Sequence, residues 1–212
     1  MTRSGAKVVV AALEAERVRF AFGIPGTHNI ELYDALADSA QITTVLVTDE
    51  QAASFMADGL ARSTGEVGVL NLVPGAGLTH ALSGIAEAFM DNVPLVVLSC
   101  GIRSDSGRAF QLHAIDQLAV ARPVTKATLH VERPDELYAT VRRAFALARA
   151  GTPGPAIVEV PAELYLLRQD FGEDWSRAGA PAPQRTGAPA PRVSQPFPVA
   201  QAPSPAVQDP SK

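Results

Sequence analysis

Glu50 is the residue of this chain with the clearest capacity for chemistry. It follows an apolar run over residues 42–47, which is expected to form a strand, and it precedes a helical pattern over residues 51–62. Open α/β sheets bind their ligands outside the carboxyl ends of the strands, so a lone carboxylate at this junction would face such a site. The structural alternative is a charge that the helix dipole stabilises at a helix N-terminus.

A glycine-rich turn is the second candidate, because Gly75 and Gly77 lie between an expected strand and an expected helix that contains Thr79. The spacing resembles a dinucleotide-binding fingerprint, but His80 occupies the position of the third glycine. No Lys-Ser/Thr pair of a phosphate-binding loop follows. What remains is either a simple tight turn or a close approach of the backbone to a flat or anionic ligand.

Other junctions carry further candidates. Pro25 and Gly26 follow a short expected strand, where proline fixes a turn and glycine lets a ligand approach; His28 lies just before the next helix and could serve the site or merely start that helix. Gln111 lies in a long loop and could bind a substrate oxygen or tie the loop to itself. Cys100 follows an apolar strand without a nearby base, which favours a small buried side chain over a nucleophile. The histidines and carboxylates show no metal-binding spacing.

These candidates need a scaffold of alternating strands and helices. Ser4 is a plausible helix cap. Strands alternating with helices of this length imply right-handed crossovers and a doubly wound, mainly parallel α/β sheet with helices on both faces. The expected strands cover residues 21–24, 42–47, 67–72, 94–99, 124–131 and 156–160, and the expected helices cover 7–20, 31–38, 51–62, 78–91 and 135–149.

Composition divides the chain into two parts. Hydrophobic residues make up 47% and charged residues 19% of the 212 residues, so a sizeable core can form. Residues 178–212 contain nine prolines among 35 residues and very few large apolar side chains. Such a segment cannot bury enough surface to offset its ordering entropy. We expect a folded domain over residues 1–170 and a disordered Pro/Ala-rich tail or linker over 171–212.

The bulk numbers exclude several classes of protein. A formal net charge of −4 and a pI near 5.6 argue against a nucleic-acid or anionic membrane surface. One cysteine cannot form an intramolecular disulfide and fits a reducing compartment. No segment reaches the roughly 20 apolar residues of a membrane span, and no signal peptide pattern opens the chain. We expect a soluble, cytoplasmic protein.

Several short motifs together resemble the acetolactate synthase family in order and spacing. They occupy residues 22–26, 48–53, 57–62, 75–79, 91–95, 110–111, 124–126 and 151–155. The resemblance covers roughly residues 4–167 and corresponds to the N-terminal, pyrimidine-binding domain of thiamine diphosphate enzymes. It extends to benzaldehyde lyase and the 2-hydroxyacyl-CoA lyases.

The resemblance implies roles for the candidate residues. Glu50 would hydrogen-bond N1′ of the aminopyrimidine ring and thereby activate the cofactor. Gln111 would lie beside the bound intermediate, and His28 matches an active-site histidine of the benzaldehyde lyase type. The other matched positions would line the aminopyrimidine or the substrate: Pro25, Gly26, Gly75, Gly77 and Thr79.

Departures from the family pattern leave the reaction open. Leu112 stands where acetolactate synthases usually have glutamate, His80 stands where asparagine is customary, and residues 115–118 resemble the lyases. The resemblance therefore implies a carboligase or decarboxylase acting on 2-keto acids, or alternatively a C–C lyase of the benzaldehyde or 2-hydroxyacyl-CoA type.

The diphosphate-binding motif of the family is absent, since no Gly-Asp-Gly occurs in the sequence. The resemblance then implies that a partner chain holds Mg²⁺ and the diphosphate, in a homodimer or a heteromer. FAD has no support in these residues. A different hypothesis is a truncated, inactive interaction module that keeps the fold, with the tail as a tether.

Overall fold

The computed structural model describes residues 2–108, 111–171 and 175. Its elements alternate between strands and helices over most of that length. In chain order they are β1 (Thr2–Ser4), α1 (Gly5–Ala15), β2 (Phe20–Gly23), α2 (Ile30–Ala37), β3 (Thr43–Leu46), α3 (Glu50–Thr64), β4 (Gly68–Leu72), α4 (Ala76–Met90), β5 (Leu95–Gly101), α5 (Gln117–Ala121), η1 (Arg122–Val124), β6 (Ala127–His130), η2 (Pro134–Glu136), α6 (Leu137–Arg149), β7 (Ala156–Pro161), α7 (Ala162–Leu166) and β8 (Arg168–Asp170).

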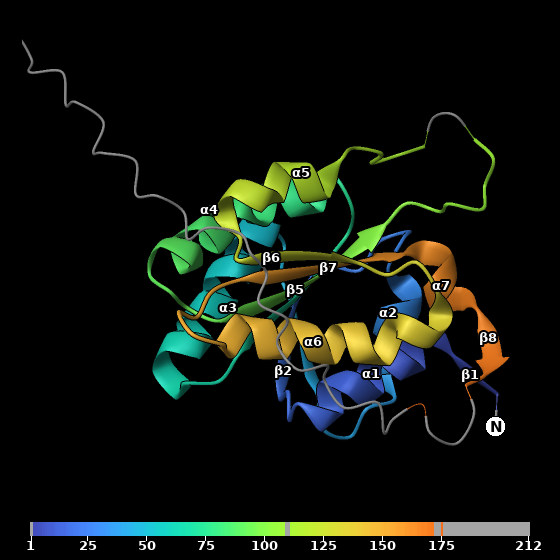
Figure 1. Cartoon of the computed structure of the whole chain (residues 1–212), viewed down its shortest axis with the longest axis horizontal. Coiled ribbons are helices and arrows are strands. Elements are labelled where there is room, and N and C mark those ends of the chain that lie inside the picture. The colour runs from blue at the N-terminus through green and yellow to red at the C-terminus, as the bar shows by residue number, and fades with distance from the viewer. Residues whose placement is uncertain (1, 109–110, 172–174, 176–212) are drawn as a thin grey trace, which may run out of the picture.

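Six of these strands form one parallel sheet in the order β3-β2-β4-β5-β7-β6, which confirms the predicted doubly wound α/β class (Figure 1). The chain runs from β2 outward to β3, then crosses back over β2 to β4 and continues in the other direction. The order therefore reverses between β2 and β4, which pair only at Phe22↔Leu70 and Gly23↔Asn71. In this class of fold, ligands bind at the carboxyl ends of the strands where the order reverses.

Helices cover both faces of the sheet, because side chains of a buried strand alternate between faces. Val96 and Leu98 belong to a core cluster that contains α1, α2 and α6, while Leu95 and Val97 belong to a cluster that contains α3 and α4. Ion pairs also hold the end of α1 against α6. Glu16, which follows α1, lies 2.5 Å from guanidinium nitrogens of Arg142 and Arg149.

A short antiparallel pair that the sequence did not predict joins the two ends of the domain. Strand β1 pairs with β8, with Thr2 opposite Asp170. Beyond β8, the rings of Trp175 and Tyr138 lie 5.3 Å apart in an edge-to-face arrangement, and Phe171 and Trp175 pack against the α1–α6 core. The predicted tail over 171–212 otherwise falls on residues 172–174 and 176–212, which lie outside the described part, so the domain boundary stays a prediction.

Two predicted element boundaries are wrong. The first helix ends at Ala15 instead of residue 20, because Arg17 takes a left-handed conformation (φ 60°) and Phe20 begins β2. Strand β6 begins at Ala127 instead of residue 124, because the preceding residues form a short 3-10 turn around Pro123. Proline lacks the N–H that a ladder needs, which accounts for the late start.

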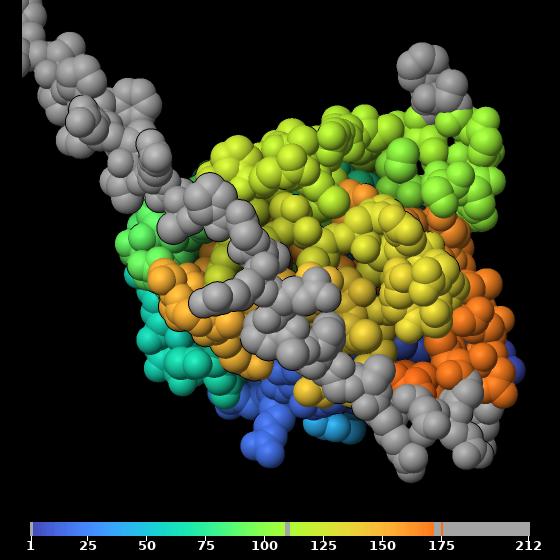
Figure 2. Space-filling view, viewed as in Figure 1, coloured from blue at the N-terminus to red at the C-terminus, as the bar shows by residue number. Residues whose placement is uncertain are grey.

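Figure 2 shows the yellow-green side chains around α5 along the top, the yellow to orange side chains of β6 and α6 below them, and the green loop after β5 projecting at the upper right. No helix in the described part of the chain is long and apolar enough to cross a membrane.

Candidate active site

All the predicted site residues come from loops at one edge of the sheet. Because the strands are parallel, the loops that follow β2, β3, β4 and β5 emerge together at the carboxyl edge. These loops and the first turns of the helices that follow them carry Pro25, Gly26 and His28; Glu50; Gly75, Gly77 and Thr79; and Gln111, respectively. The first three loops surround the switch point between β2 and β4.

Glu50 is the first residue of α3 and its carboxylate lies against the turn that follows β4. Asp49 caps the helix by accepting the Gln51 N–H at 2.7 Å, which leaves the Glu50 side chain available. That side chain is only 15% exposed, and its Oε2 lies 3.6 Å from His80 Nδ1. A Cβ added at Gly77 would lie 3.3 Å from Glu50 Oε1. The carboxylate therefore faces bare backbone.

Three predicted glycines are required by close packing. A Cβ at Gly26 would lie 2.6 Å from Val73 Cγ1, and one at Gly77 would lie 2.7 Å from Val73 Cγ2. The loops after β2 and β4 thus pack through opposite methyl groups of one valine. Gly75 has a positive φ of 60°, and a Cβ there would lie 2.6 Å from the His113 carbonyl oxygen. Side chains are excluded from these positions because Val73 and the His113 carbonyl already occupy the space.

A buried asparagine that sequence reasoning missed holds the loop after β2. Asn29 is 0% exposed; its Oδ1 accepts the Gly26 N–H at 2.7 Å, and its Nδ2 donates to the Ile24 carbonyl at 3.3 Å. The same nitrogen lies 3.4 Å from Asn71 Oδ1, at the end of β4. Its position before a helix was the only sequence signal. Asn29 therefore sets the shape of the Pro25–Gly26 turn and links it to the neighbouring strand.

His28 lies beside the loop after β5. Its ring is 5.8 Å from that of His113, and its carbonyl accepts a hydrogen bond from the Cys100 thiol at 2.5 Å. Burial and the nearby His113 lower the pKa of His28, against a smaller opposing effect of Glu31. The imidazole is thus neutral at pH 7. Burial raises the pKa of Cys100 far above its ordinary value, so this residue is a buried thiol, as expected, and no nucleophile.

Gln111 and Thr79 both bond within their own segments. Gln111 Nε2 donates to the Arg103 carbonyl at 2.8 Å, which ties the loop to itself, and its side chain also lines a cavity of about 370 Å³. Phe110, its neighbour in the predicted motif, lies outside the described residues. Thr79 is exposed and its hydroxyl donates to the Ala76 carbonyl at 3.0 Å, so it stabilises the first turn of α4.

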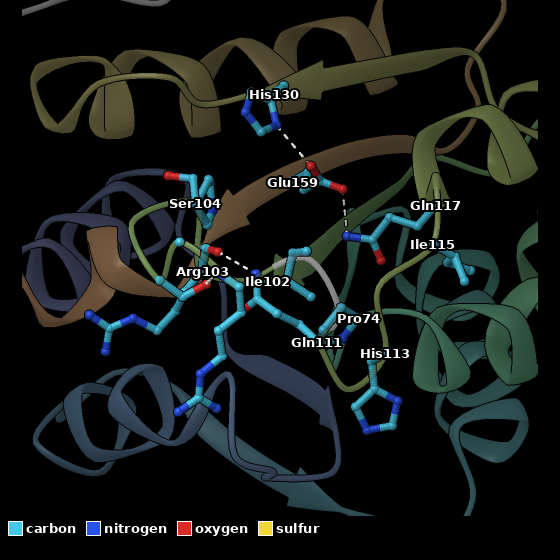
Figure 3. Close-up of a pocket in the computed structure, with 14 residues that line it drawn as sticks. Pro74, Ile102, Arg103, Ser104, Gln111, His113, Ile115, Gln117, His130 and Glu159 are labelled. Atoms are coloured by element: carbon cyan, nitrogen blue, oxygen red, sulfur yellow. Dashed lines mark hydrogen bonds and ion pairs between the residues drawn. The ribbon is translucent and has the colours of Figure 1, made fainter.

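The cavity has a polar wall that the sequence did not reveal (Figure 3). The amide of Gln117 donates to Glu159 Oε2 at 2.5 Å, and Glu159 Oε1 lies 2.8 Å from His130 Nδ1. Pro74 and His113 also line this cavity, so it adjoins the glycine turn. These groups come from β6, β7 and α5, up to 42 residues apart in sequence, and no local motif links them.

One trio of potential metal ligands occurs among residues 2–108, 111–171 and 175. Ligand atoms of Asp49, Glu50 and His80 lie within 4.8 Å of one another. Separation along the chain hid this grouping from spacing arguments. Asp49 already accepts the helix-capping hydrogen bond, and Asp49 and His80 are both solvent-exposed. We assign no ion to this trio.

Comparison with known proteins identifies the domain. Residues 3–120 match the family model described as thiamine pyrophosphate enzyme, N-terminal TPP binding domain. The acetolactate synthase isozyme 3 large subunit of Escherichia coli (strain K12) is 42% identical over 161 residues, which cover 76% of this chain and 28% of that protein. The acetolactate synthase large subunit of Haemophilus influenzae is 40% identical over 158 residues, covering 74% and 28%. Acetolactate synthase 2, chloroplastic, of Nicotiana tabacum is 39% identical over 177 residues, covering 82% and 26%.

The chain thus spans little more than a quarter of the length of these relatives. The family match ends within α5, before β6 and β7, and the matches to the relatives extend further along the chain. The chain belongs to the thiamine pyrophosphate enzymes and carries an N-terminal TPP-binding domain of the acetolactate synthase type.

Proposed function

We propose that this chain supplies the aminopyrimidine-binding part of a thiamine diphosphate-dependent, acetolactate synthase-like enzyme that acts on 2-keto acids. The observation that carries the proposal is the largely buried Glu50 carboxylate, set against the Gly77 backbone at the switch point. Gly26 and Gly77 pack closely against the two methyl groups of Val73, and the Asn29 hydrogen bonds fix the Pro25–Gly26 turn. We call the surface formed by this backbone and the Glu50 carboxylate the slot. Such a slot fits a flat heteroaromatic ring with one acid–base partner.

Glu50 would bind N1′ of that ring and hold the shared proton between its carboxylate and the ring nitrogen. Thiamine diphosphate, when bound, supplies a thiazolium carbon that can attack a carbonyl group. Burial together with Glu50 raises the pKa of Tyr33 on α2, so Tyr33 remains neutral. Glu50 is therefore free of a competing phenolate charge, and burial strengthens its interaction with a positively polarised ring nitrogen.

Gln111 and His28 belong on the substrate side in this proposal. Gln111 lines the cavity with its amide, which can hydrogen-bond a carbonyl or carboxylate oxygen. His28 is a neutral imidazole, because burial and His113 lower its pKa. A neutral imidazole can orient a substrate hydroxyl or carbonyl without adding charge. Pro25, Gly75 and Thr79 would shape the walls of the slot.

The diphosphate and Mg²⁺ require ligands from elsewhere. Mg²⁺ prefers an octahedral set of oxygen ligands, and the described residues offer only the Asp49–Glu50–His80 trio, which includes the proposed acid–base group. We propose that another domain holds the metal and the diphosphate, supplied by a partner in a homodimer or heteromer. No role for FAD is proposed.

A C–C lyase of the benzaldehyde or 2-hydroxyacyl-CoA type is the second candidate reaction. It is favoured by the placement of His28 next to His113, at the junction of the slot and the loop that borders the cavity. Position 112 is leucine and therefore offers no carboxylate to the site; its side chain is 67% exposed. Product analysis with pyruvate or with benzoin as substrate separates the two reactions in a complete enzyme.

Binding of thiamine and of thiamine diphosphate tests the half-site proposal. The lone chain should bind both ligands with similar, micromolar or weaker affinity in calorimetry, because it contacts only the shared aminopyrimidine. Adding Mg²⁺ should have no effect. Thiamine diphosphate binding that Mg²⁺ strengthens tenfold, about 1.4 kcal/mol, would show a complete site in this chain. Failure of both ligands to bind at millimolar concentration would favour the interaction-module alternative.

A further inference from the structure

Gln117 has a buried side chain whose amide oxygen and amide nitrogen both form hydrogen bonds. It is the first residue of α5 and is only 2% exposed. Its Oε1 accepts the Ser99 hydroxyl at 2.9 Å and the Gly75 N–H at 3.3 Å. Its Nε2 donates to the Cys100 carbonyl at 2.9 Å and to Glu159 Oε2 at 2.5 Å. One amide therefore joins two strands, β5 and β7, and the glycine turn.

The partners of Gln117 dictate both its orientation and its residue type. The Gly75 N–H can only donate, whereas the Cys100 carbonyl and an ionised Glu159 can only accept. An acceptor and a donor of this length and charge describe glutamine and no other natural side chain. Ionised glutamate would face Glu159 with like charge, and methionine would leave the buried Gly75 N–H and Cys100 carbonyl without this partner.

The Gly75 end of this network bears on the candidate active site. Gly75 precedes α4 with φ 60° and ψ −100°, and no side chain of its own caps that helix. The Gln117 bond and the contact with the His113 carbonyl hold it in place. Two residues later, Gly77 lies against Glu50. The other end of the amide reaches Glu159 and through it His130, on the cavity wall (Figure 3).

We propose that Gln117 is a positioning residue, which fixes the Gly75–Gly77 turn against Glu50 and ties that turn to the Glu159–His130 pair in the neighbouring cavity. The inference rests on the proposed function, because the turn forms a wall of the aminopyrimidine slot. Cavity and slot then share one amide, and a change in the charge or contacts of Glu159 reaches the cofactor side through Gln117.

Replacement of Gln117 by glutamate converts this link into a pH-dependent one. Two carboxyl groups in contact cannot both ionise readily, so the pair keeps one proton until the pH exceeds a raised apparent pKa. The singly protonated pair still offers one donor and the acceptor for Gly75. Other ionisable residues border the cavity or contact the pair, namely Cys100, Arg103, Arg108, His113 and His130.

Amide NMR on the full chain tests the proposal with Gln117→Met, Gln117→Glu and a control, Gln41→Met, at an exposed position before β3. Gln117→Met should speed hydrogen exchange at Gly75 about 3- to 10-fold, the effect of one net hydrogen bond, and should shift the Gly77 signal. Gln117→Glu should resemble the parent at low pH and lose the parent shifts as the pH rises. Adding Glu159→Gln to it should remove that pH dependence. Gln41→Met should leave both glycines unchanged.

Thiamine affinity distinguishes a positioning role from a purely structural one. Gln117→Met should weaken thiamine binding about 3- to 10-fold, while Gln41→Met should not. Parent-like Gly75 and Gly77 signals in Gln117→Met, or a pH-independent Gln117→Glu, would overturn the proposal. So would unchanged thiamine affinity in Gln117→Met when the parent binds thiamine measurably. A parent that binds no thiamine, with the Gly75 response intact, would instead refute the proposed function.

Discussion

Glu50→Gln should separate proton chemistry from folding and from cofactor binding. The change keeps the size of a side chain that is 15% exposed and lies 3.3 Å from the position of a Gly77 Cβ. The nearest basic group, His80 Nδ1, is 3.6 Å away, beyond hydrogen-bonding distance, and His80 is solvent-exposed. Losing so weak a contact should change the free energy of unfolding by less than about 1 kcal/mol.

The chemical effect should be much larger. An amide cannot share a proton with N1′ as a carboxylate can, and a positioned acid–base group contributes about 10²- to 10⁴-fold in rate. That range corresponds to about 2.7–5.5 kcal/mol in activation free energy. Binding should change far less, because the glycine-lined slot still accepts the ring.

Hydrogen–deuterium exchange at C2 of bound thiamine diphosphate measures the effect directly, with the chain combined with a diphosphate-binding partner. The control is Glu87→Gln, an exposed glutamate on α4. Exchange in Glu50→Gln within about threefold of the parent rate, at unchanged occupancy, would refute the acid–base role, since this lies below the 10²-fold expected. Glu50 would then be a helix-start carboxylate only.

Three further substitutions test the backbone at two glycines and the pH dependence of stability. Gly75→Ala should lower the free energy of unfolding by about 1–3 kcal/mol, because alanine resists a φ of 60° and its Cβ would meet the His113 carbonyl at 2.6 Å. In α3, a Cβ at Gly59 meets nothing within 4 Å, so Gly59→Ala should raise the free energy of unfolding by about 0.5–1 kcal/mol. Equal stability of Gly75→Ala and Gly59→Ala in urea denaturation would contradict this account. His28 has a folded-state pKa below 6.5, so folding favours its neutral form, and stability should decline as the pH falls below 6.5. His28→Gln should flatten that decline, and an unchanged slope between pH 7.5 and 5 would show that His28 is not its source.

The fold was predictable where sequence signals are local. Ser4 caps α1 as expected, accepting the Lys7 N–H at 3.3 Å, and the buried runs that became β4, β5 and β7 were bounded by glycine and proline. The end of α1 was not predictable, because Arg17 takes a left-handed conformation without being glycine. The β1–β8 pair depends on residues 168 positions apart, with Thr2 opposite Asp170, and three-residue strands carry no usable period.

In the candidate site, too, residues marked by local sequence signals could be predicted and residues defined by long-range contacts could not. Glu50, Gly26 and Gly77 could be chosen because each follows a strand and precedes a helix, and parallel strands bring such junctions to one edge. Their functional roles stay predictions. Asn29 and Gln117 were missed because their importance comes from hydrogen-bond partners about 42 residues away. Only the three-dimensional arrangement shows which donor meets which acceptor.

The packing of α1 against α6 has a consequence for synthesis on the ribosome. Glu16 and its partner Arg149 are 133 residues apart. At about 5–20 residues per second, the ribosome adds that many in about 7–27 s. Throughout this interval the apolar face of α1, which includes Val9 and Leu13, has no α6 to cover it. We therefore expect chaperones to bind the nascent α1 segment until α6 emerges.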